Sequence, residues 1–154
     1  NDAKAIEYYN KYLDIDPYSE SAWYNLGIIY NRLEDYVQAI DSYDFALAID
    51  ANYSAAIFNK ANALSAIERF RDSISAYLDY LRIDPDSVDA HLYLADCYFQ
   101  LDDYENAELF YDKTIRMEPI CSDGWFGAGL VMLIKDRSGE AVPLLKKSLE
   151  INPA

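Results

Sequence analysis

The sequence predicts an all-α solenoid built from antiparallel helix-turn-helix repeats of 34 residues. Within the stretch 23–50, four residues fall at i, i+3, i+4 and i+7 and so share one helical face: Trp23, Leu26, Gly27 and Tyr30. Four of the five prolines are separated by multiples of 34, namely Pro17, Pro85, Pro119 and Pro153. A fixed period of this length is typical of stacked helical hairpins.

Columns of like residues recur at the same period. One column holds small residues, Ala39, Ser73, Ala107 and Ala141, and another holds mainly tyrosines, Tyr43, Tyr77 and Tyr111, with Leu145. A small residue beside a large ring lets two helices meet while the ring fills the gap. Gly27 is expected to allow a second helix to approach closely. These columns therefore predict the packing surfaces of each hairpin.

The spacing of Trp23, Leu26, Gly27 and Tyr30, followed by Ala39 and Tyr43, resembles the W-x₂-L-G-x₂-Y and A-x₃-F pattern of the tetratricopeptide repeat family. The resemblance covers essentially all 154 residues. It implies a right-handed superhelical solenoid of 34-residue repeats. We expect a single solenoid over residues 1–154, in which residues 1–19 supply the second helix of a partial repeat. Full repeats occupy 20–53, 54–87 and 88–121, and the fourth repeat, 122–154, is one residue short of 34.

The repeats differ in how closely they follow this pattern. Repeat 20–53 is the closest, although Ala51 replaces the proline of its period. Repeat 54–87 departs most in its first helix, where Ile57 takes the Trp position and Lys60 the Leu position. The stem of Lys60 is expected to pack while its ammonium reaches solvent. Repeat 88–121 has His91 at the Trp position, and Trp125 restores it in the last repeat.

The charge balance restricts the classes of partner. The formal net charge is −14, which argues against nucleic acid and against anionic membrane surfaces. Part of the acidity has a structural explanation, because acidic residues in the turns favour the start of the helix that follows: Glu34, Asp35, Asp102 and Asp103. The remaining surplus indicates a protein or peptide partner that is neutral or basic.

The sequence contains no arrangement typical of catalysis, so we expect a protein that is not an enzyme, with no metal and no cofactor. Its one histidine, His91, lies in a packing column. Cys97 and Cys121 are 24 residues apart and lack the close spacing of a metal or redox site. The glycines form no phosphate-binding loop.

The longest apolar run, residues 125–134, is ten residues long, and a membrane span needs about 20. The chain begins without a methionine and shows no signal peptide. We therefore expect a piece of a longer protein and take the cytoplasm as the default location.

The leading functional hypothesis is a non-catalytic scaffold that binds a protein or peptide. In tetratricopeptide proteins the first helices line a concave groove that takes such partners. The resemblance places eleven residues of this chain there, namely Tyr24, Asn25, Ile28, Phe58, Asn59, Asn62, Asp89, Tyr93, Asp96, Asp123 and Phe126. Three of them, Ile28, Phe58 and Phe126, are apolar, and either a partner or neighbouring helices would cover them.

Two alternatives stay open at this point. The chain could be a self-assembling structural module, because an unpaired helix at one end and an uncovered last helix at the other would permit self-association through the solenoid ends. It could instead be a regulatory segment of a longer enzyme.

Overall fold

The protein is described by a computed structural model that covers residues 2–153. These residues form nine α-helices and no strand. In chain order the helices are α1 (Asp2–Ile15), α2 (Glu20–Arg32), α3 (Tyr36–Ile49), α4 (Ser54–Ala66), α5 (Phe70–Ile83), α6 (Val88–Gln100), α7 (Tyr104–Met117), α8 (Ser122–Ile134) and α9 (Ser138–Ile151). The all-α prediction is confirmed.

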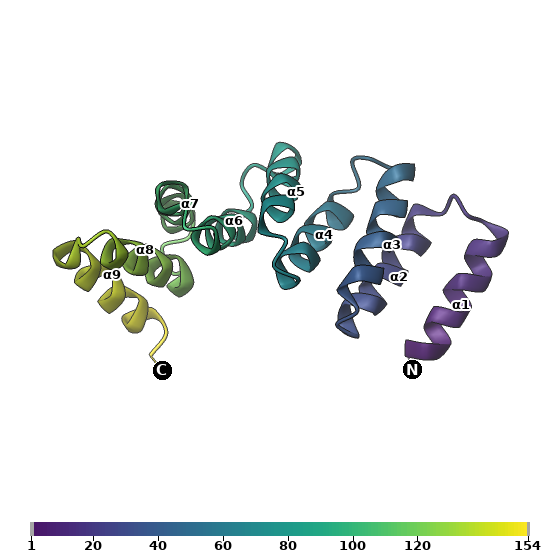
Figure 1. Ribbon diagram of the computed structural model, residues 1–154, viewed down its shortest axis with the longest axis horizontal. Coiled ribbons are helices and arrows are strands. Elements are labelled where there is room, and N and C mark those ends of the chain that lie inside the picture. Colours follow the sequence, from purple (N-terminus) through teal and green to yellow (C-terminus); the bar gives the residue numbers. More distant parts are fainter. Residues whose placement is uncertain (1, 154) are drawn as a thin grey trace. The chain divides into compact units, whose positions relative to one another are not determined.

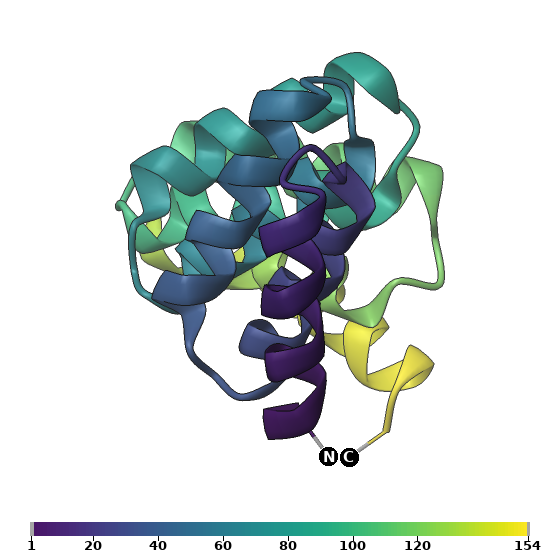
Figure 2. The same ribbon diagram turned by 90° about the vertical axis from the view of Figure 1, so that its right-hand side faces the viewer.

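The helices pack as consecutive antiparallel hairpins within two compact units, residues 1–83 and residues 84–154. In the first unit α2 pairs with α3 and α4 with α5, while α3 packs on α4 (Figure 1). Helix α1 packs against α2 and stands in front of it in Figure 2. In the second unit α6 pairs with α7 and α8 with α9. Each predicted repeat thus contains two helices, whereas a single domain over 1–154 and its superhelical hand stay predictions.

The turns inside the hairpins repeat with the sequence period. Four residues spaced by 34 adopt left-handed backbone angles, with φ of 60° at Glu34, 60° at Glu68, 58° at Asp102 and 56° at Asp136. A residue in this conformation after the last helical turn lets the orphan carbonyls of the helix be satisfied. At Glu34, for example, the amides of residues 34 and 35 donate to the carbonyls of Asn31 and Tyr30.

Side-chain caps start the helices that follow. The carboxylate of Asp35 accepts from the Gln38 amide at 3.3 Å, and that of Asp103 accepts from the Asn106 amide at 3.2 Å. The hydroxyl of Ser19 accepts from the Ala22 amide at 3.3 Å. These bonds satisfy donors that have no partner within the helix. The acidic residues predicted to favour helix starts therefore include true caps.

The core consists of the two predicted columns. The small residues Ala39, Ser73, Ala107 and Ala141 are fully buried, and Tyr43, Tyr77 and Tyr111 are buried with them. A Cβ built at Gly27 would lie 2.7 Å from Cδ1 of Tyr43, so a side chain at this position would force the ring or the helix to shift. The close approach predicted at Gly27 is confirmed.

Candidate functional site

In the first unit, two successive first helices carry a surface of aromatic and amide side chains, here called the first-helix surface: Tyr24, Asn25 and Ile28 of α2 with Phe58, Asn59 and Asn62 of α4. The Asn59 amide nitrogen donates to the Tyr24 hydroxyl at 3.0 Å. This bond links the two helices and engages Nδ2 of Asn59.

Two aromatic groups flank that bond. The ring of Tyr24 lies 4.9 Å from that of Tyr53, and the ring of Phe58 lies 5.0 Å from that of Tyr80. Phe58 also meets Tyr77 edge-on, with ring centroids 5.9 Å apart. Phe58 is consequently half-buried, because rings of its own hairpin cover part of it.

A second hydrogen bond fixes Asn62. The Tyr77 hydroxyl donates to Asn62 Oδ1 at 2.5 Å. Asn62 Oδ1 and Asn59 Nδ2 are thus engaged inside the protein. The Nδ2 of Asn62 and the Oδ1 of Asn59 are the atoms that can donate to and accept from an added chain.

The structure does not bring every predicted residue of the first unit into this cluster. Asn25 is exposed and lines a shallow pocket of about 220 Å³ shared with Tyr8, Tyr9 and Tyr12 of α1. Ile28 is half-buried. It occupies the sequence position, one period earlier, at which Asn62 meets Tyr77.

The register at Ile28 has a consequence below the surface. The buried hydroxyl of Tyr43, one period before Tyr77, is the side-chain polar atom of the described residues that is buried without a hydrogen-bond partner. At this repeat position α4 has the amide of Asn62 and α6 has the carboxylate of Asp96, whereas α2 has the hydrocarbon side chain of Ile28. The tyrosine column therefore has a polar partner at Tyr77 and Tyr111 but none at Tyr43.

In the second unit, four predicted residues form an acidic cluster: Asp89, Tyr93 and Asp96 of α6 with Asp123 of α8. The pKa of the Tyr93 phenol lies above its ordinary value, first because the protein shields it from water and then because the three carboxylates oppose another negative charge. The predicted patch is thus a set of groups close enough to interact. Phe126 of α8 is 51% exposed, so the described residues leave about half of it uncovered.

Asp96 has a special place in the acidic cluster. Its Oδ1 accepts from the buried Tyr111 hydroxyl at 2.6 Å. Loss of water around the carboxylate raises its pKa, the Tyr111 hydrogen bond lowers it, and the charge of Asp123 raises it again, with a net upward shift. The cluster therefore holds negative charge that a nearby cation would stabilise.

Two residues that pack beside the first-helix surface escaped the sequence analysis. Tyr53 stands at a helix start where the same column has Ser19 and Ser87, and it makes no side-chain cap. Tyr80 stands in a column that holds Ala46 and Thr114 in the neighbouring repeats, although Tyr12 occupies it in the partial first repeat. A large ring at a position that is small in the neighbouring repeats was the available signal in both cases.

Neither a metal site nor a membrane span is evident in the part of the chain described. Among residues 2–153, no group of three or more His, Cys, Asp or Glu side chains is arranged to hold a metal ion. None of the described helices combines the length and apolarity needed to cross a bilayer.

Models of the tetratricopeptide repeat match residues 21–53 and residues 58–119, together more than half of the chain. No curated protein matches the sequence. Solved structures that are similar include MamA, with 26% identity, a TM-score of 0.91, and coverage of 95% of this chain and 85% of that one.

Two further structures extend the comparison. A MamA fragment from residue 41 to the end, from Desulfovibrio magneticus RS-1, has 19% identity and a TM-score of 0.92, covering 97% of this chain and 85% of that one. YrrB, described as a tetratricopeptide protein with an unusual peptide-binding site, has 20% identity and a TM-score of 0.90, covering 99% of this chain and 78% of that one. With its repeated hairpins and these matches, the chain belongs to the tetratricopeptide repeat family and has the all-α helical-repeat solenoid fold.

Proposed function

We propose that this protein is a non-catalytic scaffold that binds a protein or peptide segment on the first helices of its repeats. Tetratricopeptide proteins are interaction scaffolds as a class, and YrrB is a protein of this fold that is described as having a peptide-binding site. The observation that carries the proposal is the hydrogen bond from Asn59 to Tyr24, with aromatic rings on both sides.

This arrangement suits an extended backbone. Asn59 Oδ1 would accept from a peptide N–H and Asn62 Nδ2 would donate to a peptide carbonyl, while Tyr24 and Phe58 would cover apolar side chains. The amides are held by Tyr24 and Tyr77 before any partner arrives. Preorganisation of this kind lowers the ordering cost of binding.

The acidic cluster of the second unit would select the charge of a segment that binds there. Three carboxylates around Tyr93 would favour a segment carrying Lys or Arg. The net charge of −14 has the same sign. Binding should weaken with added salt, because exposed charges are screened over about 10 Å at 0.1 M ionic strength.

Selection from a phage-displayed library of random 12-residue peptides tests the proposal, because such a library offers segments of every charge and composition. The dissociation constant of a selected peptide is then measured with the Asn59→Leu variant, which keeps side-chain bulk but removes the carbonyl oxygen and the amino group of the side-chain amide. Asn10→Leu, at an exposed position of α1, is the matched control. We expect at least a tenfold loss, about 1.4 kcal/mol, from Asn59→Leu alone.

Charge is tested with Asp89→Lys and Asp123→Lys, which leave the bond between Asp96 and Tyr111 intact. Selected peptides should be neutral or basic, and basic peptides that bind the second unit should bind these variants at least tenfold more weakly, whereas an acidic peptide should not bind the wild type. Peptides that bind all variants equally would contradict the proposed surface. A chain that selects no peptide and forms larger species as concentration rises would favour the self-assembling module. Selection of peptides only when further domains are attached would favour the regulatory segment of a longer enzyme.

A further inference from the structure

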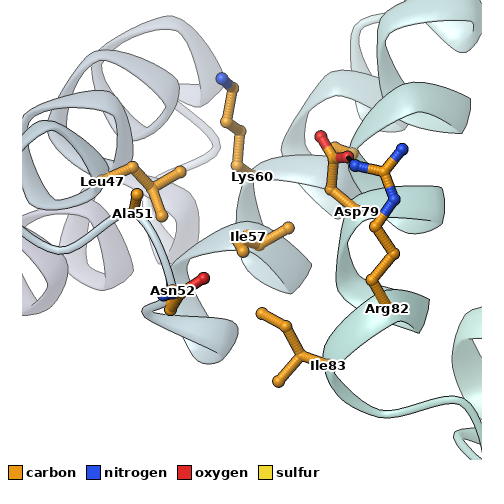
Figure 3. A pocket seen from close by; sticks show the side chains of 9 residues that line it. Leu47, Ala51, Asn52, Ile57, Lys60, Asp79, Arg82 and Ile83 are labelled. Carbon is orange, nitrogen blue, oxygen red and sulfur yellow. Dashed lines mark hydrogen bonds and ion pairs between the residues drawn. The ribbon is translucent and has the colours of Figure 1, made fainter.

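The first unit contains a pocket of about 300 Å³ on the side of α4 opposite the first-helix surface. Figure 3 shows its lining, which comes from the end of α3 and the following turn, from α4 and from α5: Leu47, Ala51, Asn52, Ile57, Lys60, Ala76, Asp79, Arg82 and Ile83. Ile57 and Lys60 lie on the packing side of α4, and Phe58, Asn59 and Asn62 on the other. The pocket is therefore separate from the proposed peptide surface.

The repeat register explains why a hollow exists here. One period earlier, the indole of Trp23 stacks on Phe45, with ring centroids 4.4 Å apart and planes 24° from parallel. In the second hairpin the same two positions hold Ile57 and Asp79. An indole and the phenyl ring on which it stacks are both replaced by smaller side chains, and the pocket is lined by the replacements.

The hydrogen-bond acceptor for an indole also has its counterpart. Trp23 Nε1 donates to the Pro17 carbonyl at 2.9 Å, and Trp125 Nε1 donates to the Pro119 carbonyl at 2.9 Å. The corresponding residue in the second hairpin is Ala51, which lines the pocket. The two tryptophans, Trp23 and Trp125, thus show how an indole is held at the repeat position that Ile57 occupies in the second hairpin.

We propose that the pocket receives the tryptophan side chain of a polypeptide partner. Its aliphatic lining, above all Leu47 and Ile57, provides apolar contact for the ring, and the Ala51 carbonyl accepts from the indole N–H. Arg82, paired with Asp79 at 2.8 Å, lies at the rim, where a guanidinium can cover an aromatic face. A volume of about 300 Å³ is at the lower end of ligand pockets and suits one side chain.

The charges around the pocket favour an internal residue of a polypeptide over a free amino acid. Lys60 pairs with Asp44, and its ammonium points away from Ile57 in Figure 3. Arg82 is engaged by Asp79. These two cations are already engaged by carboxylates of the same unit. The charged ends of a free amino acid would therefore gain little from them, whereas the backbone around an internal residue of a peptide is neutral and needs no charged partner.

The test is a titration of the isotope-labelled full chain with a blocked Gly-Trp-Gly peptide, followed by the amide NMR signals of Ala51, Asn52, Ile57 and Ile83. A single side chain should bind weakly, on the order of 1 mM. A blocked Gly-Ala-Gly peptide and free tryptophan are the comparison ligands. We expect saturable shifts at these four amides with the tryptophan peptide, none with the alanine peptide, and no tighter binding of free tryptophan.

Two variants of pocket-lining residues test the proposal. Ile57→Trp should restore the arrangement seen at Trp23, abolish the shifts and leave the melting temperature unchanged or higher. Asp79→Phe, at an exposed position, supplies the counterpart of Phe45 and should strengthen binding of the tryptophan peptide at least threefold, and it serves if Ile57→Trp does not fold. Val37→Trp, an exposed α3 residue outside the pocket, should not affect binding. Absence of shifts in the wild type, equal shifts in Ile57→Trp, or tighter binding of free tryptophan would each overturn the proposal.

Discussion

Replacing Tyr43 with phenylalanine should make the protein more stable, although Tyr43 is fully buried. Its hydroxyl is buried without a hydrogen-bond partner among the described residues. Burial raises the pKa of this phenol far above its ordinary value, so the group is a neutral hydroxyl at any working pH. In the folded chain it has given up its bonds to water and gained none.

The expected size follows from the cost of an unsatisfied buried group, about 1–3 kcal/mol. Phenylalanine keeps the ring that packs on Gly27, so no cavity is opened. We expect Tyr43→Phe to raise the free energy of unfolding by about 1 kcal/mol. Tyr77→Phe removes the bond to Asn62 and should lower it by about 1 kcal/mol.

Urea denaturation followed by circular dichroism measures both variants against the wild type. The two midpoints should move in opposite directions. A further variant, Ile28→Asn, supplies the amide that α4 offers to Tyr77, and in that background Tyr43→Phe should no longer stabilise. If Tyr43→Phe lowers the midpoint as much as Tyr77→Phe does, the hydroxyl is satisfied in solution and the reasoning fails.

Three other predictions concern single positions. A Cβ at Gly127 would overlap the Tyr111 ring, so Gly127→Ala should lower the free energy of unfolding by about 2 kcal/mol. A Cβ at Gly139 would have nothing within 4 Å, so Gly139→Ala should raise it by about 0.5–1 kcal/mol in chemical denaturation. Equal effects of the two variants would contradict this packing. The pKa of Asp96 is raised in the folded protein, so the folded chain binds this proton more readily than the unfolded chain does. The free energy of unfolding should therefore fall as pH rises above 3.8 through the folded pKa. Asp96→Asn keeps an acceptor for Tyr111 and does not titrate, so its urea midpoint should lack that part of the fall. Glu68 has a left-handed backbone conformation that glycine adopts without strain, so Glu68→Gly should raise the free energy of unfolding by about 0.5 kcal/mol. A lower free energy of unfolding in this variant would show that the turn is not strained.

Much of the fold could be predicted from the sequence, because the same packing residues recur in each repeat. The period of 34 residues placed the helical hairpins, and the alternation of Ala39 with Tyr43 identified the buried face. Lys60 was expected to pack its stem and extend its ammonium, and the structure adds its partner, Asp44. Local spacing suffices for such features because each repeat contacts mainly its neighbours in sequence.

The candidate site was less accessible to that reasoning. Helical spacing correctly grouped Asp89, Tyr93 and Asp96, and the period added Asp123. It could not show that Asn59 donates to Tyr24, because that bond depends on side-chain rotamers on two helices.

The sequence by itself determined the class of fold, the repeat register and the sign of the surface charge. Only the tertiary structure decided which departures from the repeat matter. Ile57 in place of a tryptophan opens a pocket, while Ile28 in place of an amide leaves the Tyr43 hydroxyl without a partner. In both cases a contact between helices is lost. A sequence pattern shows which residue is present, but it does not show which contact the neighbouring residues lose. Three-dimensional packing makes that loss visible because interiors are close-packed and each missing atom leaves either a void or an unsatisfied group.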